Sequence, residues 1–346
     1  MDFTPIPREV IWDVTYACPL RCLHCYSESG RRPARAVDPD SRARIADAII
    51  SMRPQGVSIA GGEPLLLRDL GSLADRIRKS GIPVSLYTSG WLAEKLAADE
   101  ILQAFTSIVV SVDGATAEVH DRIRGRRGSF DRAMKALRIL SRESARRRAR
   151  GEEPLKFGID CVVLRSNYRQ IEQFCTLMAS RYPELDSLAF GAAVPSGLAS
   201  RAGVAEHELL TDDQVTRLED PQVLARLKQL LPGSVHLYLT GNKSLQMHPD
   251  QVAQGTASCA MQIEPDGQVR AMPIYEGTVG SLLEEAPEIL WRRAQERWGD
   301  PFVVAALSRV RTMQDWAVAA RRIDYHFGTP EVRSRIDRRP VHHAAC

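Results

Sequence analysis

The sequence predicts an α/β protein built on a parallel sheet, and two observations support this class. Short apolar runs rich in β-branched residues recur along the first 200 residues, and segments with helical spacing of apolar residues separate them. The alternation of strand and helix repeats about six times, which is typical of a parallel sheet with right-handed crossovers. In such a sheet, whether open or closed into a barrel, functional groups gather where the strands end.

The predicted strands are short and apolar, as strands covered on both faces should be. They span residues 9–16, 56–62, 83–90, 107–114, 156–164 and 187–194. The predicted helices carry apolar residues three and four positions apart, so that one face of each can pack on the sheet. They span residues 40–52, 70–81, 93–105, 129–144 and 169–181.

The composition excludes several classes of function. The N-terminus has no basic region followed by an apolar run, and no stretch is long and apolar enough to cross a membrane. We therefore expect a cytoplasmic protein with no membrane partner. The net charge of +3 gives no reason to expect nucleic acid. Seven cysteines, unevenly spaced over 346 residues, do not form a disulfide framework, so we expect reduced thiols that serve metal binding or redox chemistry.

Three of the cysteines lie together just after the first predicted strand. In the stretch CPLRCLHCY, Cys18, Cys22 and Cys25 have the spacing C-x3-C-x2-C. Structural zinc needs four ligands, usually in paired CxxC or CxxH groups, and the sequence has no second pair. Inert packing is the other alternative, but a loop with Pro19 and Arg21 is an unusual core. Three thiolates at this spacing suit a four-iron cluster with one iron left open.

These cysteines and four further motifs resemble the radical S-adenosylmethionine superfamily. The cysteine loop is similar to its C-x3-C-x-Φ-C signature, in which Φ is usually aromatic and is His24 here. AGGEPLL (60–66) resembles the GGEP motif after the second strand, and LYTSGWL (86–92) resembles the turn after the third. Residues 110–134 and 162–171 resemble the ends of the fourth and fifth strands. The matches cover roughly residues 8–200 and imply a partial (β/α)6 TIM-like barrel.

The resemblance implies one [4Fe-4S] cluster on Cys18, Cys22 and Cys25, with S-adenosylmethionine at the open iron. Glu63 is expected to receive the amine of the cofactor, and Ser111, Asp113 and Arg124 are expected to face its ribose or carboxylate. A plain turn remains an alternative for Asp113, and a surface position for Arg124. The other motif residues expected to contact the cofactor are His24, Tyr26, Gly61, Gly62, Pro64, Thr88 and Asn167.

The resemblance also implies the chemistry. A reduced cluster would cleave S-adenosylmethionine to a 5′-deoxyadenosyl radical, which takes a hydrogen atom from a substrate that the protein positions away from water. An external low-potential donor such as flavodoxin or ferredoxin would supply the electron.

Three function classes follow from this chemistry. We expect an oxidoreductase or epimerase acting on a natural-product or peptide substrate. Peptides are less favoured, because only 17 residues precede Cys18 and leave no room there for a peptide-recognition module. A maturase or cofactor-biosynthesis enzyme acting on a protein side chain or a tetrapyrrole is the alternative. A non-enzymatic iron–sulfur scaffold is the third class.

Residues 201–346 are predicted to form a C-terminal extension after a barrel domain of residues 1–200. Residues 201–258 have a helical and polar pattern, Asp266-Gly267 lies between two alternating runs as in a β-hairpin, and helices follow. This order resembles SPASM or twitch extensions, which hold an auxiliary cluster. Met272, however, stands where a ligand cysteine is expected. We therefore expect a degenerate extension that shapes the substrate site and has lost its metal.

Two cysteines of the extension leave alternatives open. Cys259 and Cys346 could hold an auxiliary cluster with help from other residues, or Cys259 could be a packed small hydrophobe. Cys259 could instead face the barrel mouth opposite the cofactor and give a hydrogen atom to the substrate radical, which would make it the catalytic residue of an epimerase. The tail that ends in Cys346 is expected to be unstructured.

Overall fold

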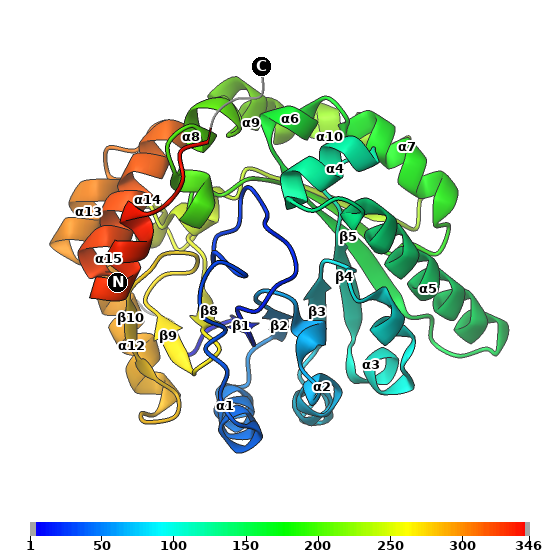
Figure 1. Cartoon of the computed structure of the whole chain (residues 1–346), viewed down its shortest axis with the longest axis horizontal. Helices are drawn as coiled ribbons and strands as arrows, with labels where there is room; N and C mark the ends of the chain where they lie inside the picture. Colours follow the sequence, from blue (N-terminus) through cyan, green and yellow to red (C-terminus); the bar gives the residue numbers. More distant parts are fainter. Residues whose placement is uncertain (1–4, 343–346) are drawn as a thin grey trace.

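The computed structural model describes residues 5–342 and confirms the predicted α/β class. Within these residues one ten-stranded sheet has the order β10-β9-β8-β1-β2-β3-β4-β5-β6-β7. Neighbours from β8 to β7 are parallel, and only β9 and β10 run antiparallel to their neighbours. Figure 1 shows the helices around the outside of the curved sheet, with the segment after β1 in the middle. The architecture is an open, partial barrel.

The strands are short, and all six that the sequence predicts are present. Their bounds are β1 (Glu9–Asp13), β2 (Gly56–Ala60), β3 (Val84–Thr88), β4 (Ser107–Ser111), β5 (Lys156–Val163), β6 (Ser187–Ala192), β7 (His236–Thr240), β8 (Ala260–Ile263), β9 (Gln268–Arg270) and β10 (Thr278–Ser281).

The helices follow the strands as crossover connections and then form the C-terminal part. The α-helices are α1 (Pro39–Met52), α2 (Leu70–Lys79), α3 (Asp99–Ala104), α4 (Ala117–Arg124), α5 (Ser129–Ala149), α6 (Arg165–Tyr168), α7 (Ile171–Arg181), α8 (Val204–His207), α9 (Asp212–Leu218), α10 (Pro221–Lys228), α11 (Pro249–Ala253), α12 (Pro287–Trp298), α13 (Pro301–Leu307), α14 (Met313–Phe327) and α15 (Pro330–Asp337). The 3-10 helices are η1 (Pro64–Leu66), η2 (Ala93–Ala97), η3 (Gly197–Ser200) and η4 (Lys243–Gln246).

Alternation along each strand separates the core from the inside of the barrel. In β1, Val10 and Trp12 are fully buried in the core, whereas Ile11 between them lines an internal cavity. In β5, Ile159 and Cys161 are buried in the core and Asp160 lines the same cavity. Successive side chains of a strand point to opposite faces, so each strand contributes to both the core and the barrel interior.

The structure differs from the predicted elements in two places. The predicted helix over 93–105 is divided into η2 and α3, because Ala98 between them has extended backbone angles (φ −74°, ψ 129°). The segment 201–258, predicted to be helical, also contains strand β7, which extends the sheet beyond β6. β7 has only five residues and lies between helices. A run of this length is too short for its alternation to be recognised as a strand from the sequence.

The C-terminal hairpin continues the barrel sheet. β8 pairs in parallel with β1, and Ala260 lies opposite Glu9. The loop after β9 is held by aromatic side chains: Trp298 Nε1 donates to Ala271 O (2.8 Å), and Trp316 Nε1 donates to Tyr275 Oη (2.7 Å). β6 and β7 pair in the same sheet although the predicted domain boundary at residue 200 lies between them in the sequence. The division into domains at that residue stays a prediction.

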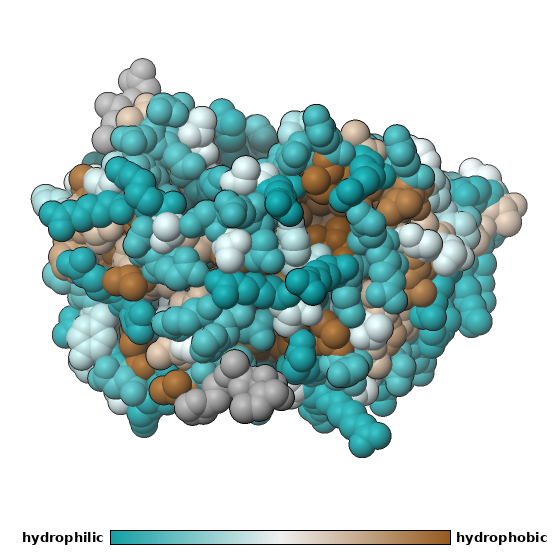
Figure 2. All heavy atoms as spheres, turned by 90° about the horizontal axis from the view of Figure 1, so that it is seen from above, coloured by the Kyte–Doolittle hydropathy of each residue, from teal (hydrophilic) through white to brown (hydrophobic). Residues whose placement is uncertain are grey.

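The surface gives two further observations. The face in Figure 2 is mostly hydrophilic, with apolar residues scattered among charged ones. Among residues 5–342, no helix combines the length and apolar character needed to cross a bilayer.

Candidate active site

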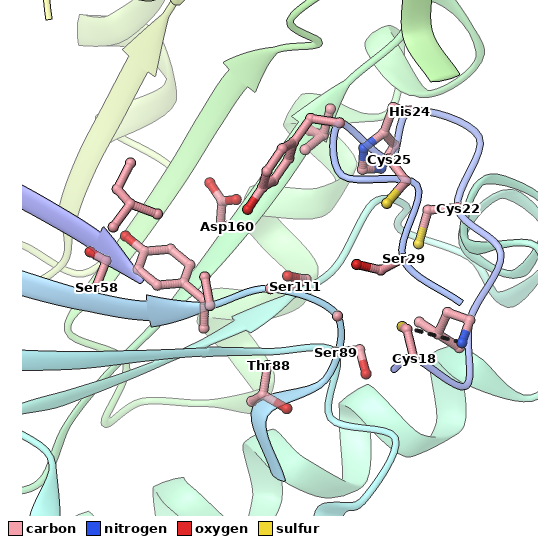
Figure 3. A pocket seen from close by; sticks show the side chains of 18 of the residues that line it. Cys18, Cys22, His24, Cys25, Ser29, Ser58, Thr88, Ser89, Ser111 and Asp160 are labelled. Carbon is pink, nitrogen blue, oxygen red and sulfur yellow. Dashed lines mark hydrogen bonds between the residues drawn. The ribbon is translucent and has the colours of Figure 1, made fainter. Parts of the chain in front are cut away.

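A cavity of about 320 Å³ lies inside the barrel and extends to the carboxyl ends of its strands. Its walls come from the cysteine loop, from strands β1 to β5 and β8, and from segments that follow β7 and β9. Figure 3 shows the three cysteines at one end of this cavity and Asp160 and Ser58 toward the other. The lining residues are Ile11, Cys18, Leu20, Cys22, His24, Cys25, Tyr26, Ser29, Ser58, Ala60, Gly61, Gly62, Tyr87, Thr88, Ser89, Ser111, Arg124, Asp160, Val162, Leu245, Gln262 and Ile274.

Backbone hydrogen bonds hold the cysteine loop, residues 14–38, over the strand ends. They connect it to the turn after β2, to the end of α4 and to η3, so that parts of the chain far apart in sequence fix its path. These bonds are Glu63 N to Ala17 O (3.0 Å), Arg21 N to Arg124 O (3.0 Å), Leu23 N to Ile123 O (2.8 Å) and Leu198 N to Cys25 O (3.1 Å).

The three predicted cluster thiols are brought together in this cavity. Burial raises the pKa of Cys18 to about 12 and that of Cys22 to about 11, although Arg124 beside Cys22 opposes the second shift. These two thiols are therefore protonated at neutral pH in the free protein, and a metal would have to displace their protons. In the described part of the chain, no three His, Cys, Asp or Glu side chains converge on a point that suits a single metal ion. An iron–sulfur cluster instead takes each thiolate on a different iron, which suits thiols spread along one wall.

Gly61 and Gly62 line the cavity, and their absent side chains allow two loops to meet. Gly61 has φ +122°, and a Cβ there would overlap the carbonyl oxygen of Thr15. A Cβ at Gly62 would overlap Ala17 O and lie 3.1 Å from the Cβ of Cys18. These two glycines therefore allow the turn after β2 to approach the cysteine loop closely, in addition to any ligand.

Glu63 lies beneath the cavity and not on its wall. Its carboxylate is fully buried and accepts hydrogen bonds from Thr88 Oγ1 (2.7 Å), from the Ser89 backbone N–H (3.0 Å) and from the Ser89 hydroxyl. Burial raises the pKa of Glu63, and the donors on Thr88 and Ser89 oppose this shift. In this structure Glu63 fixes the turn that carries Thr88 and Ser89, both of which do line the cavity. Its predicted pairing with the cofactor's amine stays a prediction.

Asp113 also lies behind the wall, where it joins two cavity residues. His24 Nε2 is 2.8 Å and Arg124 Nε is 2.6 Å from Asp113 Oδ2, while Oδ1 accepts a hydrogen bond from Val162 N (2.9 Å). Burial alone would raise the pKa of Asp113, but Arg124 and His24 lower it well below its usual range. Asp113 therefore stays ionised, and its oxygens are already used to position His24 and Arg124.

Arg124 has an unused donor that points to a ligand. The residue lines the cavity and is 7% exposed, so it is not one more surface arginine. Its Nη2 atom is buried and has no hydrogen-bond partner among the described residues. A buried donor without a partner is costly, and an anionic or hydroxyl oxygen would remove that cost. The residues around the cavity therefore fit a cluster on the thiols and a cofactor that offers oxygen atoms to Arg124.

The remaining predicted residues divide into two groups. Tyr26, Thr88 and Ser111 line the cavity, and Tyr26 is fixed by its hydroxyl, which donates to Asp13 Oδ1 (2.6 Å). Pro64 and Asn167 are buried outside the cavity lining. Asn167 ties the end of β5 to the turn after β4, since its Nδ2 donates to Val162 O (2.9 Å) and Asp113 O (2.8 Å).

The expectation that Cys259 faces the barrel mouth is wrong. Cys259 immediately precedes β8, and its carbonyl accepts a hydrogen bond from Arg8 N (3.1 Å), so it lies beside the start of β1. The cysteine loop follows the opposite end of β1, and a five-residue strand separates these two edges by about 16 Å. Cys259 is also absent from the cavity lining. Cys346 lies outside the described residues.

Sequence reasoning missed several polar residues of the cavity. Asp160, Ser58, Tyr87 and Gln262 all line it from strand interiors. The only signal was the polar character of single positions inside apolar strands, above all Asp160 in KFGIDCVV. Asp160 is the one carboxylate among the described residues of the lining. Burial raises its pKa to about 6, with a further contribution from Asp113.

The fold is a partial α/β barrel, and three cysteines lie at one end of the cavity at its strand ends. This combination is typical of barrel proteins that bind an iron–sulfur cluster, and comparisons with known proteins support that class. Residues 12–148 match the radical SAM superfamily. The mycofactocin maturase MftC of Mycobacterium tuberculosis is 33% identical over 274 residues, which cover 77% of this chain and 64% of MftC. MftC of Mycobacterium ulcerans is also 33% identical, with 77% of this chain and 68% of that protein covered.

Two solved structures share the fold. Streptococcus suis SuiB, bound to precursor peptide SuiA, has a TM-score of 0.64 at 16% identity, with 90% of this chain and 68% of SuiB covered. The protein anSMEcpe with bound AdoMet has a TM-score of 0.60 at 17% identity, with 96% and 99% covered. These similarities confirm the partial-barrel fold class.

The chain belongs to the radical SAM superfamily, whose members use S-adenosylmethionine and a four-iron cluster. It spans 64% of the length of MftC from Mycobacterium tuberculosis. Its own reaction, substrate and partners are therefore taken up as proposals.

Proposed function

We propose that this chain is a radical SAM enzyme that matures a peptide precursor of a natural product. The observation that carries the proposal is one cavity in which Cys18, Cys22 and Cys25 lie together with the unpartnered Nη2 atom of Arg124. The three thiols would hold one [4Fe-4S] cluster, and Arg124 would face an oxygen of S-adenosylmethionine. When bound, this pair supplies a one-electron reductive cleavage that removes a hydrogen atom from a substrate.

The chain's own buried carboxylates position residues of the cavity wall. Glu63 fixes the turn of Thr88 and Ser89, and Asp113 fixes His24 and Arg124, so both walls are positioned by buried carboxylates. The apolar side chains of Ile11, Leu245 and Ile274 contribute to the lining between these polar groups. Polar groups that are fixed in position favour a reaction in which a reactive species must be directed to one atom.

The relatives support the proposed substrate class. The name mycofactocin maturase supports a maturation reaction, and SuiB, which shares the fold, binds a precursor peptide. A peptide substrate is therefore more favoured than the sequence alone indicates. Both oxidation and epimerisation are compatible with this proposal, and Cys259 is not offered as a hydrogen-atom donor because of its position at the amino edge of the sheet.

The partner would be an acidic flavodoxin or ferredoxin that supplies the electron. Five exposed arginines lie on the cysteine loop, on the last turn of α4 and on the α4–α5 turn, and none forms an ion pair with a carboxylate of the described chain. The combined positive charge of these five arginines exceeds the net charge of the whole protein, which is +3. A positive surface next to the cluster would attract an acidic donor. These residues, named here the arginine collar, are Arg21, Arg31, Arg122, Arg126 and Arg127.

The test combines reconstituted enzyme with a precursor peptide. Cluster-loaded protein, S-adenosylmethionine and reductant are incubated with candidate precursor peptides in deuterated water, and peptide mass and 5′-deoxyadenosine are measured. A modified peptide with matching 5′-deoxyadenosine would support the proposal. Loss of two hydrogens would indicate oxidation, and one deuterium at a carbon would indicate epimerisation. Turnover of a non-peptide substrate but of no peptide would contradict the substrate class, and a protein that takes up no iron would contradict the chemistry.

A further inference from the structure

The loop between β9 and β10, residues 271–277, places Ile274 in the wall of the cavity. The backbone of Ile274 is in the left-handed region, with φ +70°, although its side chain is β-branched. Glycine or asparagine adopts this conformation at a lower cost, so the backbone by itself does not explain an isoleucine at this position. A strained residue that faces a cavity points to a ligand that contacts its side chain.

Hydrogen bonds before and after the side chain hold Ile274 in this conformation. The N–H of Ile274 donates to Gln262 Oε1 (2.6 Å), and Gln262 Nε2 donates in turn to Asp13 Oδ2 (2.8 Å). Two residues further along, the N–H of Glu276 donates to Asp324 Oδ1 (2.8 Å). Side chains from β1, β8 and α14 therefore fix the loop, and Ile274 cannot turn away from the cavity unless these bonds break.

Three apolar side chains from separate parts of the chain form the apolar wall of the cavity, which consists of Ile11, Leu245 and Ile274. Ile11 lies opposite Gln262 in the pairing of β1 with β8. The hydroxyl of Tyr275 donates to Gln246 O (2.9 Å), so the residue after Ile274 is joined to the residue after Leu245. Because Gln262 uses its Oε1 and Nε2 atoms within the protein, a ligand at this wall contacts mainly apolar surface.

The apolar wall and the thiol–arginine part of the cavity belong to different strands. In the sheet order β8 lies beyond β1, on the side away from β4, and Arg124 ends the helix that follows β4. The volume of about 320 Å³ is near the lower end of the range for one small ligand, so the cavity has room beyond a cofactor for one side chain of a peptide. A charged side chain would be buried there without a partner, whereas an aliphatic one gains free energy from burial.

We infer that Ile274 is a specificity-determining residue that contacts an aliphatic side chain on the peptide residue that is modified. The inference rests on the proposed function and narrows its substrate class to peptides whose modified residue is aliphatic. The strained backbone directs the side chain of Ile274 into the cavity, and this side chain limits the size of the substrate side chain that fits.

The experiment measures peptide binding without turnover. Cluster-loaded protein in its oxidised state, with excess S-adenosylmethionine, is dialysed against labelled forms of the precursor peptide that wild type modifies. In these forms the modified residue is alanine, valine, leucine, phenylalanine or aspartate. The proteins are wild type, Ile274→Gly, which suits the left-handed backbone, Ile274→Val and the control Met272→Ala. Met272 is buried in the same loop but is absent from the cavity lining, and thermal unfolding shows which variants fold.

The expected result is a change in the order of affinities. Wild type should bind the valine or leucine peptide about 10- to 200-fold more tightly than the phenylalanine and aspartate peptides. Ile274→Gly should bind the phenylalanine peptide at least about tenfold more tightly than wild type does and the valine peptide more weakly, because the subsite is larger. Ile274→Val should shift the affinities in the same direction by a smaller factor. Met272→Ala should change the affinity for all five peptides by the same factor.

Two results would overturn the inference while leaving the proposed function intact, since the precursor peptide is still modified. One is an Ile274→Gly protein with the same ratios of affinity as wild type, which would limit Ile274 to packing; if this variant does not fold, the Ile274→Val protein decides by the same criterion. The other is a wild type that binds the aspartate peptide as tightly as the leucine peptide. A wild type that modifies no peptide would overturn the proposed function and this inference together.

Discussion

His24 and Asp113 are 89 positions apart in the sequence, yet His24 Nε2 lies 2.8 Å from Asp113 Oδ2. Arg124 binds the same oxygen at 2.6 Å, so one buried carboxylate joins the cysteine loop, the end of β4 and the end of α4. Asp113 is fully buried and His24 and Arg124 are nearly so, with side-chain exposures of 11% and 8%. The cysteine loop therefore depends on a buried charge network, and this network reaches the thiol of Cys22 through Arg124.

Asp113→Asn should destabilise the metal-free protein by about 3–5 kcal/mol, because it leaves the charge of Arg124 buried without its partner. The free energy of unfolding in urea measures this effect. Glu94→Gln is the control, because Glu94 pairs with Arg132 and Lys135 at the surface and should cost less than about 1 kcal/mol. Equal effects of the two substitutions would show that the buried network contributes no more than a surface pair.

Anaerobically reconstituted protein should bind about four irons per chain through Cys18, Cys22 and Cys25. Replacing any of the three by alanine should remove most of the iron and the visible absorbance of the cluster. Cys259→Ala is the control and should leave the iron content unchanged, because Cys259 lies at the other edge of the sheet. Iron near eight per chain that falls in the Cys259→Ala protein would reveal an auxiliary cluster.

Glu63→Ala should destabilise the protein by at least about 1–3 kcal/mol, because the buried backbone N–H of Ser89 loses its acceptor. Glu63→Gln keeps an acceptor oxygen and should destabilise the protein less than Glu63→Ala does. Chemical unfolding of the metal-free proteins tests this ranking. A Glu63→Ala protein as stable as wild type would mean that the Thr88–Ser89 turn does not depend on this carboxylate.

The cofactor contact of Glu63 needs a separate measurement on the same variants. If Glu63 also pairs with the amine, Glu63→Gln should bind S-adenosylmethionine about 10- to 150-fold more weakly with unchanged iron content. Equilibrium dialysis on cluster-loaded protein gives the dissociation constants. Unchanged affinity in the glutamine variant would limit Glu63 to fixing the turn.

The double substitution Arg122→Glu and Arg127→Glu should slow reduction of the cluster by an acidic flavodoxin about tenfold at low ionic strength, since it reverses two charges of the arginine collar. Neither side chain has a hydrogen bond within the described chain, so the fold should not change. Stopped-flow absorbance of the cluster follows the reaction. The difference should shrink as salt is added, because salt screens exposed charges.

Two controls belong to this measurement. Arg142→Glu with Lys156→Glu makes the same charge change at exposed positions away from the collar and should have a smaller effect. Dithionite, a small reductant that does not need docking, should reduce all proteins at similar rates. If the control pair slows the flavodoxin reaction as much as the collar pair, the collar is not a docking site.

Asp160→Asn should stabilise the protein at pH 7.5 by up to about 3 kcal/mol and by much less at pH 4. Burial raises the folded-state pKa of Asp160 from 3.8 to about 6, so its ionisation costs folding energy, at about 1.36 kcal/mol for each pKa unit. This cost appears as pH rises through the window from about 4 to 6. Unfolding in urea at several pH values measures the difference. A difference that does not vary with pH would show that the pKa of Asp160 is the same in the folded and the unfolded protein.

The local patterns of the sequence determined most of the fold. Strand and helix periodicity identified six strands of the sheet, since side-chain alternation is a property of neighbouring residues. The spacing of Cys18, Cys22 and Cys25 predicted a cluster loop in the same way, and the structure brings these thiols to one cavity. The Asp-Gly turn located the hairpin, because turn geometry depends on two residues.

Tertiary structure alone decided which of the candidate residues reach the cavity. Strand pairing placed Asp160 beside Ser111 and put Cys259 at the far edge from the thiols, and no local pattern encodes a pairing between distant strands. Burial decided that Glu63 and Asp113 lie behind the wall and position Ser89, His24 and Arg124. A carboxylate is the same residue in the sequence whether it contacts a ligand or holds another side chain, and only its neighbours in space determine which of these it does.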